Sequence, residues 1–165
     1  MGEFSFMHWL IVAALGYVFW RFFKSNTPTG GGKATALRQA NVSPAFTWPR
    51  RDEYEFEVVG ESNYQRALQA LAGDHGDDAA DLQTTAVVVP YDSNPYDDKA
   101  VKVLIDGHEV GHLSREDARS YRRRLAAKKQ GMVAAQCGAL VMGGFIGRDG
   151  KRASYGVRLD LKPFE

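Results

Sequence analysis

The chain has 165 residues, enough for one domain with a hydrophobic core, and its net charge of +1 argues against coating nucleic acid by bulk electrostatic attraction. A local basic patch is still compatible with this balance. The one cysteine, Cys137, excludes an internal disulfide and leaves no Cys-x-x-Cys pair for a zinc ribbon.

The first segment, residues 4–23, opens with the run Phe4–Trp20, which is apolar on all faces, unlike an amphipathic surface helix. As a helix it would be about 30 Å long, which matches the hydrocarbon core of a bilayer. Arg21 and Lys24 flank its C-terminal end, the reverse of the polarity of a cleaved signal peptide. We therefore expect one transmembrane helix within residues 1–24, rather than a signal peptide or a buried core helix. The positive-inside rule then predicts a single-pass membrane protein with a cytoplasmic C-terminal domain.

Residues 25–52 are expected to form a linker. They contain the run Gly30-Gly31-Gly32 and the dipeptides Ser43-Pro44 and Trp48-Pro49, which interrupt any long helix or strand. The remaining residues, 53–165, are expected to form the folded domain.

The domain begins with regular patterns. Tyr54, Phe56 and Val58 alternate with glutamates, which predicts a half-buried strand. Residues 64–71 have apolar positions at helical spacing before Gly73, which predicts a short helix. The β-branched run 84–90 predicts the next strand.

The second half begins with a hairpin. Residues 100–105 and 108–113 read as two strands joined by the turn Asp106-Gly107. Ser114 then caps a helix, with Asp117 at its third position, that runs to about Lys128. Strands are expected in the ranges 133–146 and 153–161.

These elements follow the order βαβββαββ. The fold class is therefore mainly β with two helices (α+β), in which hairpin connections imply antiparallel pairing. A small, partly open barrel with two packed helices is the expected closure of such short strands.

The segment 108–112 matches H-E-x-x-H, a zinc metalloprotease motif. That chemistry needs both histidines on one face of a helix, with Glu109 as general base. Here a hairpin turn precedes the motif, and on a regular strand His108 and His112 would point to the same face but lie about 13 Å apart, too far to share one ion. We expect no metal site and no other cofactor.

A second motif lies just upstream, where residues 94–103 read N-P-Y-D-D-K-A-V-K-V. It is similar to the N-P-Y-D-x-x-A-(I/V)-x-V signature of HIRAN domains. The run Val110-Gly111-His112-Leu113 follows at the matching distance and is similar to the family's V-G-(H/Y)-L. The resemblance spans about Tyr54–Phe164 and implies an OB-like barrel.

HIRAN domains occur in fork-remodelling helicases, where they capture single-stranded DNA at a free 3′ end. The resemblance implies that Tyr96 stacks on a base and that Asp97 accepts a hydrogen bond from the terminal 3′-hydroxyl. Asn94 would shape or contact the pocket. Asn-Pro-Tyr-Asp is also good turn chemistry, so a purely structural loop is the alternative.

The resemblance also implies that His112 and Arg115 face the last phosphates and that Tyr64 is a second stacking ring. Arg115, Arg119 and Arg122 fall on one face of the expected helix. This face could contact phosphates or anionic lipid, or could simply be solvated.

The leading hypothesis is a membrane-anchored module that binds single-stranded nucleic acid, with DNA 3′ ends as partner and residues 4–23 in the lipid bilayer. It would not itself be an enzyme. One alternative is a membrane-tethered protein-interaction module. Another is a zinc-dependent hydrolase built on His108, Glu109 and His112.

Overall fold

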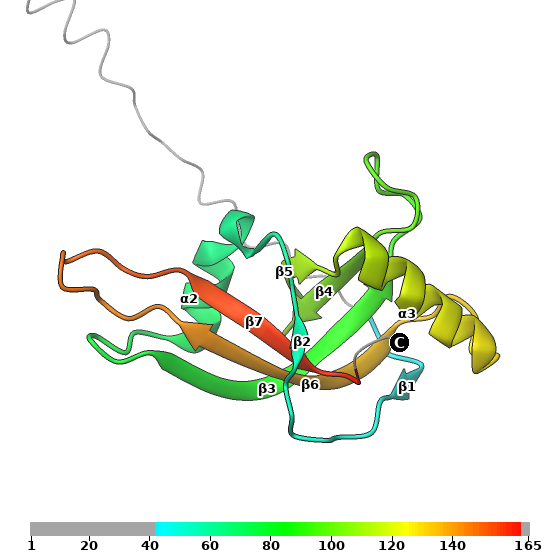
Figure 1. Cartoon of the computed structure of the whole chain (residues 1–165), viewed down its shortest axis with the longest axis horizontal. Coiled ribbons are helices and arrows are strands. Elements are labelled where there is room, and N and C mark those ends of the chain that lie inside the picture. The colour runs from blue at the N-terminus through cyan, green and yellow to red at the C-terminus, as the bar shows by residue number, and fades with distance from the viewer. Residues whose placement is uncertain (1–41, 163–165) are drawn as a thin grey trace, which may run out of the picture. The chain divides into compact units, whose positions relative to one another are not determined.

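Within residues 42–162, which the computed structural model describes, one curled sheet has the strand order β2-β7-β6-β3-β4-β5, with β1 pairing parallel to β6 (Figure 1). These residues belong to one compact unit, Leu37–Glu165. The strands are β1 Phe46–Thr47, β2 Phe56–Glu57, β3 Ala80–Pro90, β4 Val101–Ile105, β5 His108–His112, β6 Ala135–Gly143 and β7 Tyr155–Asp160. The helical elements are η1 Glu61–Asn63, α2 Gln65–Ala72 and α3 Arg115–Ala127.

The sheet curls until its two ends meet. The Val59 amide donates to His112 O at 2.8 Å and the His112 amide donates to Val59 O at 2.9 Å, which joins the end of β5 to the chain after β2. Gly111 permits this approach, because a Cβ there would lie 2.4 Å from Val58 Cγ1. The prediction of a mainly β fold with two helices and a curled antiparallel sheet is confirmed and is consistent with an OB-like fold.

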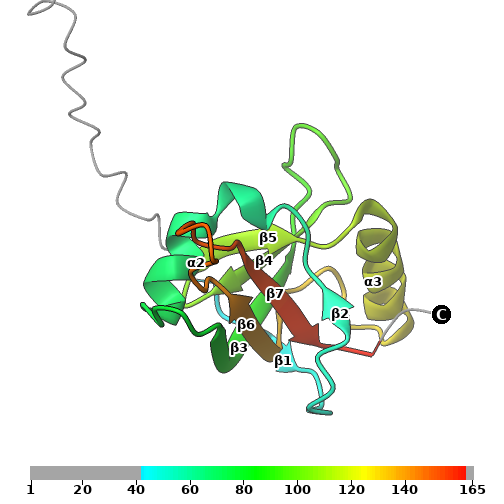
Figure 2. The same cartoon turned by 60° about the vertical axis from the view of Figure 1, so that its left-hand side comes forward.

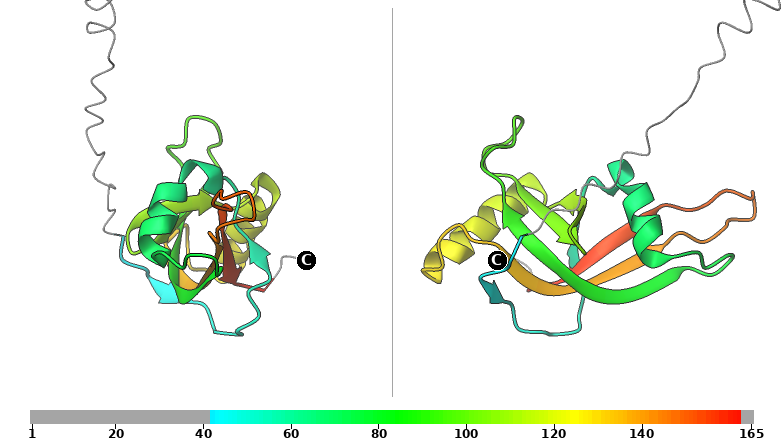
Figure 3. Two further views of the ribbon diagram at one scale, coloured as in Figure 1. Left: turned by 90° about the vertical axis from the view of Figure 1, so that its left-hand side faces the viewer. Right: turned by 180° about the vertical axis from the view of Figure 1, so that it is seen from behind.

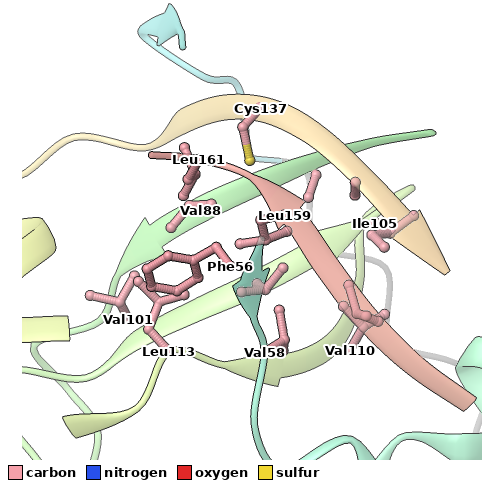
Figure 4. Close-up of a cluster of buried hydrophobic side chains, with 14 of the residues drawn as sticks. Phe56, Val58, Val88, Val101, Ile105, Val110, Leu113, Cys137, Leu159 and Leu161 are labelled. Carbon is pink, nitrogen blue, oxygen red and sulfur yellow. The ribbon is translucent and has the colours of Figure 1, made fainter. Parts of the chain in front are cut away.

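The apolar side chains of the alternating strands meet inside the barrel (Figure 4). Phe56 and Val58 are buried while Glu55 and Glu57 are exposed, as the alternation predicted. Burial of each large apolar side chain contributes about 1.5–3 kcal/mol. The alternation therefore selects which face of each strand turns inward.

The two helices lie on different sides of the strands (Figure 2). Ser114 caps α3 as predicted, since its Oγ accepts the Asp117 amide at 3.1 Å. Figure 3 shows the hairpin of β6 and β7 extending past α2. None of the helices within residues 42–162 is long and apolar enough to cross a membrane. The predicted transmembrane helix at residues 4–23 lies outside the described residues.

The structure places part of the expected linker on the barrel. Trp48 is 7% exposed, and its indole packs edge-on against Tyr121 with ring centroids 6.1 Å apart. The amides of Ala45 and Trp48 donate to carbonyls next to and within β6, each at 2.8 Å. Pro44 lies just before this short edge segment and Pro49 just after it, where neither needs to donate a ladder hydrogen bond. The folded unit thus begins before residue 53.

Asp160 holds the next part of the same segment. Its carboxylate is 1% exposed and accepts the amides of Arg51 at 2.8 Å, Asp52 at 3.0 Å and Glu53 at 3.4 Å. Burial acts to raise the pKa of Asp160, but these three donors, together with the charge of Arg50, bring the pKa below its usual value. A buried anion at the end of β7 therefore fixes the chain that enters the barrel.

Candidate nucleic-acid interface

The loop between β3 and β4 projects beside α3 (Figures 1 and 2) and carries three of the predicted site residues. Asn94 Oδ1 accepts the amides of Tyr96 at 2.9 Å and Asp97 at 3.2 Å. This Asx-type turn explains the Asn-Pro-Tyr-Asp sequence locally. The Tyr96 ring itself is 87% exposed, so the turn presents an unburied aromatic side chain to solvent.

Asp97 lies next to Tyr96 but is held differently. Its side chain is 12% exposed, and Oδ1 accepts the Lys99 amide at 2.9 Å. Oδ2 lies 3.4 Å from Arg119 Nη1 and 3.9 Å from Arg115 Nε. The Lys99 amide is the main cause that lowers the pKa of Asp97; desolvation opposes it and the two arginines reinforce it. An ionised carboxylate is thus fixed against the first turns of α3.

Arg122 has a structural role, which differs from the phosphate-contacting, lipid-contacting and solvated alternatives for the arginine face of this helix. Its guanidinium donates to Lys99 O at 2.8 Å and Ala100 O at 3.0 Å, and Nη2 pairs with Asp92 Oδ1 at 2.7 Å. It therefore ties both ends of the β3–β4 loop to α3. Arg122 lies on the buried face of α3, because residues four apart share a helix face and Ala118 is buried.

The H-E-x-x-H segment forms β5, joined to β4 by a turn at Asp106 and Gly107 that both have positive φ, as the hairpin prediction requires. The register of β4 with β5 shifts between Val103 and Leu104, which is a β-bulge. His108 pairs with core residue Ile105 and His112 with Lys102.

Directly paired residues on neighbouring strands point to the same face of the sheet. Lys102 and Ile105 are three positions apart on β4, so their side chains point to opposite faces. The two histidines of the motif therefore lie on opposite faces of the sheet, and not on the same face as expected. The described residues contain no group of three or more histidine, cysteine or acidic side chains placed to hold a metal ion. The geometry of β5 gives no support to the zinc-hydrolase alternative.

The structure brings Tyr64 and His112 together around Glu109, which the sequence had suggested only as part of a zinc site. Tyr64 Oη donates a short hydrogen bond to Glu109 Oε1, and His112 Nε2 lies 3.5 Å from the same oxygen. The two rings have centroids 6.2 Å apart. Burial, followed by the bond to Glu109, raises the pKa of the Tyr64 phenol. No local sequence pattern predicts this contact, because it depends on the bulge in the pairing of β4 with β5.

The predicted site residues thus form two groups. The loop group contains Asn94, Tyr96 and Asp97 with Arg115, which is 77% exposed at the start of α3. The strand group contains Tyr64 and His112. Only Leu113 and Ser114 separate His112 from Arg115 along the chain, so the groups flank the junction of β5 and α3. This junction offers an exposed aromatic ring, cations and an ionised carboxylate.

Comparisons with known proteins show the family of this chain. A search of curated proteins found no match. Among solved structures, the chain is similar to the crystal structure of the HIRAN domain of human HLTF, with 21% identity, a TM-score of 0.31, and coverage of 63% of this chain and 70% of that chain. The model of the HIRAN domain family matches residues 50–137, more than half of the sequence, and the chain therefore belongs to the HIRAN family.

Proposed function

We propose that this domain captures single-stranded DNA at a free 3′ end, using the loop and strand groups on either side of the β5–α3 junction. HIRAN domains are DNA-binding modules, so membership of the family supports nucleic-acid binding. The observation that carries the finer proposal is the Asp97 carboxylate, fixed between an exposed tyrosine and two arginines.

Tyr96 supplies stacking in this proposal. A base stacked on an aromatic side chain contributes about 1–3 kcal/mol, and every base has a face to offer. The 87% exposed ring is open to a base without displacement of core side chains. Binding through Tyr96 is therefore expected to depend little on sequence.

Asp97 supplies the preference for an end. A carboxylate accepts a hydrogen bond from a terminal 3′-hydroxyl but repels a phosphate. An internal nucleotide has phosphate on its 3′ oxygen, so the hydroxyl is absent there. The fixed Oδ1 of Asp97 keeps the carboxylate plane in place, while Oδ2 faces Arg119 and Arg115.

In this proposal, His112 and Arg115 contact the phosphates. They lie at the end of β5 and the beginning of α3. The exposed guanidinium of Arg115 is positioned near Asp97 and can turn to a phosphate by side-chain rotation. Tyr64 lies against His112 and is the second stacking ring in this proposal.

The proposal is tested with three labelled single strands of one sequence: one ending in a 3′-hydroxyl, one in a 3′-phosphate, and one circular. Fluorescence anisotropy should give the tightest binding for the 3′-hydroxyl strand. Tyr96→Ala should weaken binding of all three by about 1–3 kcal/mol, because stacking does not depend on the end. Equal affinity of the wild type for all three strands would refute end capture. Failure to bind any of them would favour the protein-interaction alternative.

A membrane tether is the second part of the proposal. The segment of residues 4–23, with Arg21 and Lys24 at its C-terminal end, supports one transmembrane helix within residues 1–24, with a linker leading to a cytoplasmic domain. A reporter fused after Glu165 should act in the cytoplasm, and deletion of residues 1–24 should release the protein from membranes. Full-length protein that stays in solution without detergent would contradict the tether.

A further inference from the structure

We propose that Glu109 is a positioning residue that holds Tyr64 and His112 in the orientation in which they contact the bound single-stranded DNA. This inference deepens the proposed function and rests on it. It assigns to the glutamate of the H-E-x-x-H segment a role that involves neither a metal nor catalysis.

The β-bulge places Glu109 and His112 on one face of the sheet. Glu109 pairs with Leu104 and His112 pairs with Lys102, and these two partners are two positions apart on β4. Residues two apart on a strand share a face, so Glu109 and His112 lie on one face although they are three apart in sequence. In a regular strand, residues three apart would point to opposite faces.

One oxygen serves both neighbours. Glu109 Oε1 accepts the Tyr64 hydroxyl and lies 3.5 Å from His112 Nε2. The side chains of Glu109 and His112 are both about a third exposed or less, at 34% and 26%. The cluster thus lies at the surface, where a ligand can reach it, with its polar atoms turned toward one another.

The main chains of the two neighbours are already fixed. Tyr64 N donates to Glu61 O at 2.9 Å, and Tyr64 O accepts the Leu68 amide at 3.0 Å at the start of α2. The main chain of His112 is bonded in both directions to Val59. The freedom that remains is rotation of the two rings, and this is what the shared Glu109 oxygen restricts. Rings that are ordered before binding lose less side-chain entropy on binding.

Glu109 cannot act by attraction, since its negative charge lies beside the residue proposed to face phosphate. Positioning and charge therefore make opposite predictions for Glu109→Ala, because loss of the shared acceptor weakens binding while loss of a repulsive charge strengthens it. Glu109→Gln keeps an oxygen acceptor for Tyr64 and removes only the charge.

The experiment measures binding of the 3′-hydroxyl strand by the full chain in detergent. Glu109→Ala should weaken binding about fivefold or more, the size expected when two rings must be ordered on binding. Glu109→Gln should bind as tightly as the wild type or more tightly. Tyr64→Phe keeps the ring and loses the bond, and it should weaken binding about threefold. The matched control is Glu55→Ala, which removes an exposed carboxylate from the chain before β2.

A second readout does not depend on ligand. In the wild type and in Glu109→Gln, nuclear Overhauser contacts should join the Tyr64 and His112 rings; in Glu109→Ala they should be lost. Persistence of these contacts in Glu109→Ala, or unchanged DNA affinity of that variant, would overturn the positioning role. If no strand binds the wild type, the proposed function fails, and the ring contacts still decide whether Glu109 orients the two side chains.

Discussion

Two aspartates in this domain both have a lowered pKa, yet their surroundings differ. Asp160 is buried, and its carboxylate accepts hydrogen bonds from the three backbone amides of residues 51–53. Asp97 accepts one backbone amide, and its second oxygen faces two arginine side chains at the surface. A carboxylate saturated by rigid donors is part of the fold. One whose partners are mobile side chains can exchange them for a ligand. A lowered pKa alone therefore does not identify a binding residue.

The largest expected effect is on Asp160. Asp160→Ala should lower the free energy of unfolding by about 3 kcal/mol, because it removes the anion that binds three amides. Urea denaturation at neutral pH measures this loss. Since the folded pKa lies below the unfolded one, the wild-type advantage is complete above the ordinary aspartate pKa of about 4 and declines as pH falls through the folded value. An advantage that grew toward low pH would contradict the assignment.

The next effect concerns the base of the β3–β4 loop. Arg122→Met keeps much of the buried stem but loses the bonds to Lys99 O, Ala100 O and Asp92. Stability should fall by about 2 kcal/mol, and hydrogen exchange of the loop amides should accelerate. Arg123→Met, an exposed neighbour on the same helix, is the matched control and should change little. Equal behaviour of the two variants would show that Arg122 does not anchor the loop.

Replacement of the second aspartate, Asp97, by alanine tests the comparison with Asp160 directly. Asp97→Ala should change the free energy of unfolding by about 1 kcal/mol or less, because its ion pairs are formed with exposed arginines. It should nevertheless erase the preference for a 3′-hydroxyl over a 3′-phosphate strand in anisotropy measurements. A large loss of stability with an unchanged preference would place Asp97 with Asp160 as a residue of the fold.

The smallest effect is expected for Arg115, which is mostly exposed. Arg115→Ala should leave the melting temperature nearly unchanged and weaken binding of all strands about uniformly. The slope of log affinity against log salt should become shallower by about 0.7, the value for one phosphate contact on a single strand. An unchanged salt slope would remove Arg115 from the phosphate contacts.

Local patterns in the sequence predicted most of the barrel. Alternation around Phe56, the Asp106-Gly107 turn and the Ser114 cap all depend on neighbours within a few residues, and all are confirmed. The loop motif and the V-G-H-L run also identified the family, which the family match confirms. Their roles in binding remain predictions.

The features that the sequence missed depend on partners far apart in the chain. Trp48 contacts Tyr121, 73 positions away, and Arg51 contacts Asp160, 109 positions away. Proline and glycine around Trp48 indicated a linker because local composition does not report such contacts. The meeting of Glu109 with His112 was missed for another reason: one extra residue in β5 changes which side chains share a face.

The two hydrogen bonds between Val59 and His112 place the seam of the barrel at a proposed ligand-binding residue. A seam of two bonds can open by local fluctuation without unfolding the long ladder of β3 and β6. The amides of Val59 and His112 should therefore exchange with solvent faster than those of the central strands. A DNA strand bound at His112 would hold the two edges of the sheet together. Slower hydrogen exchange of the Val59 and His112 amides would therefore report DNA binding.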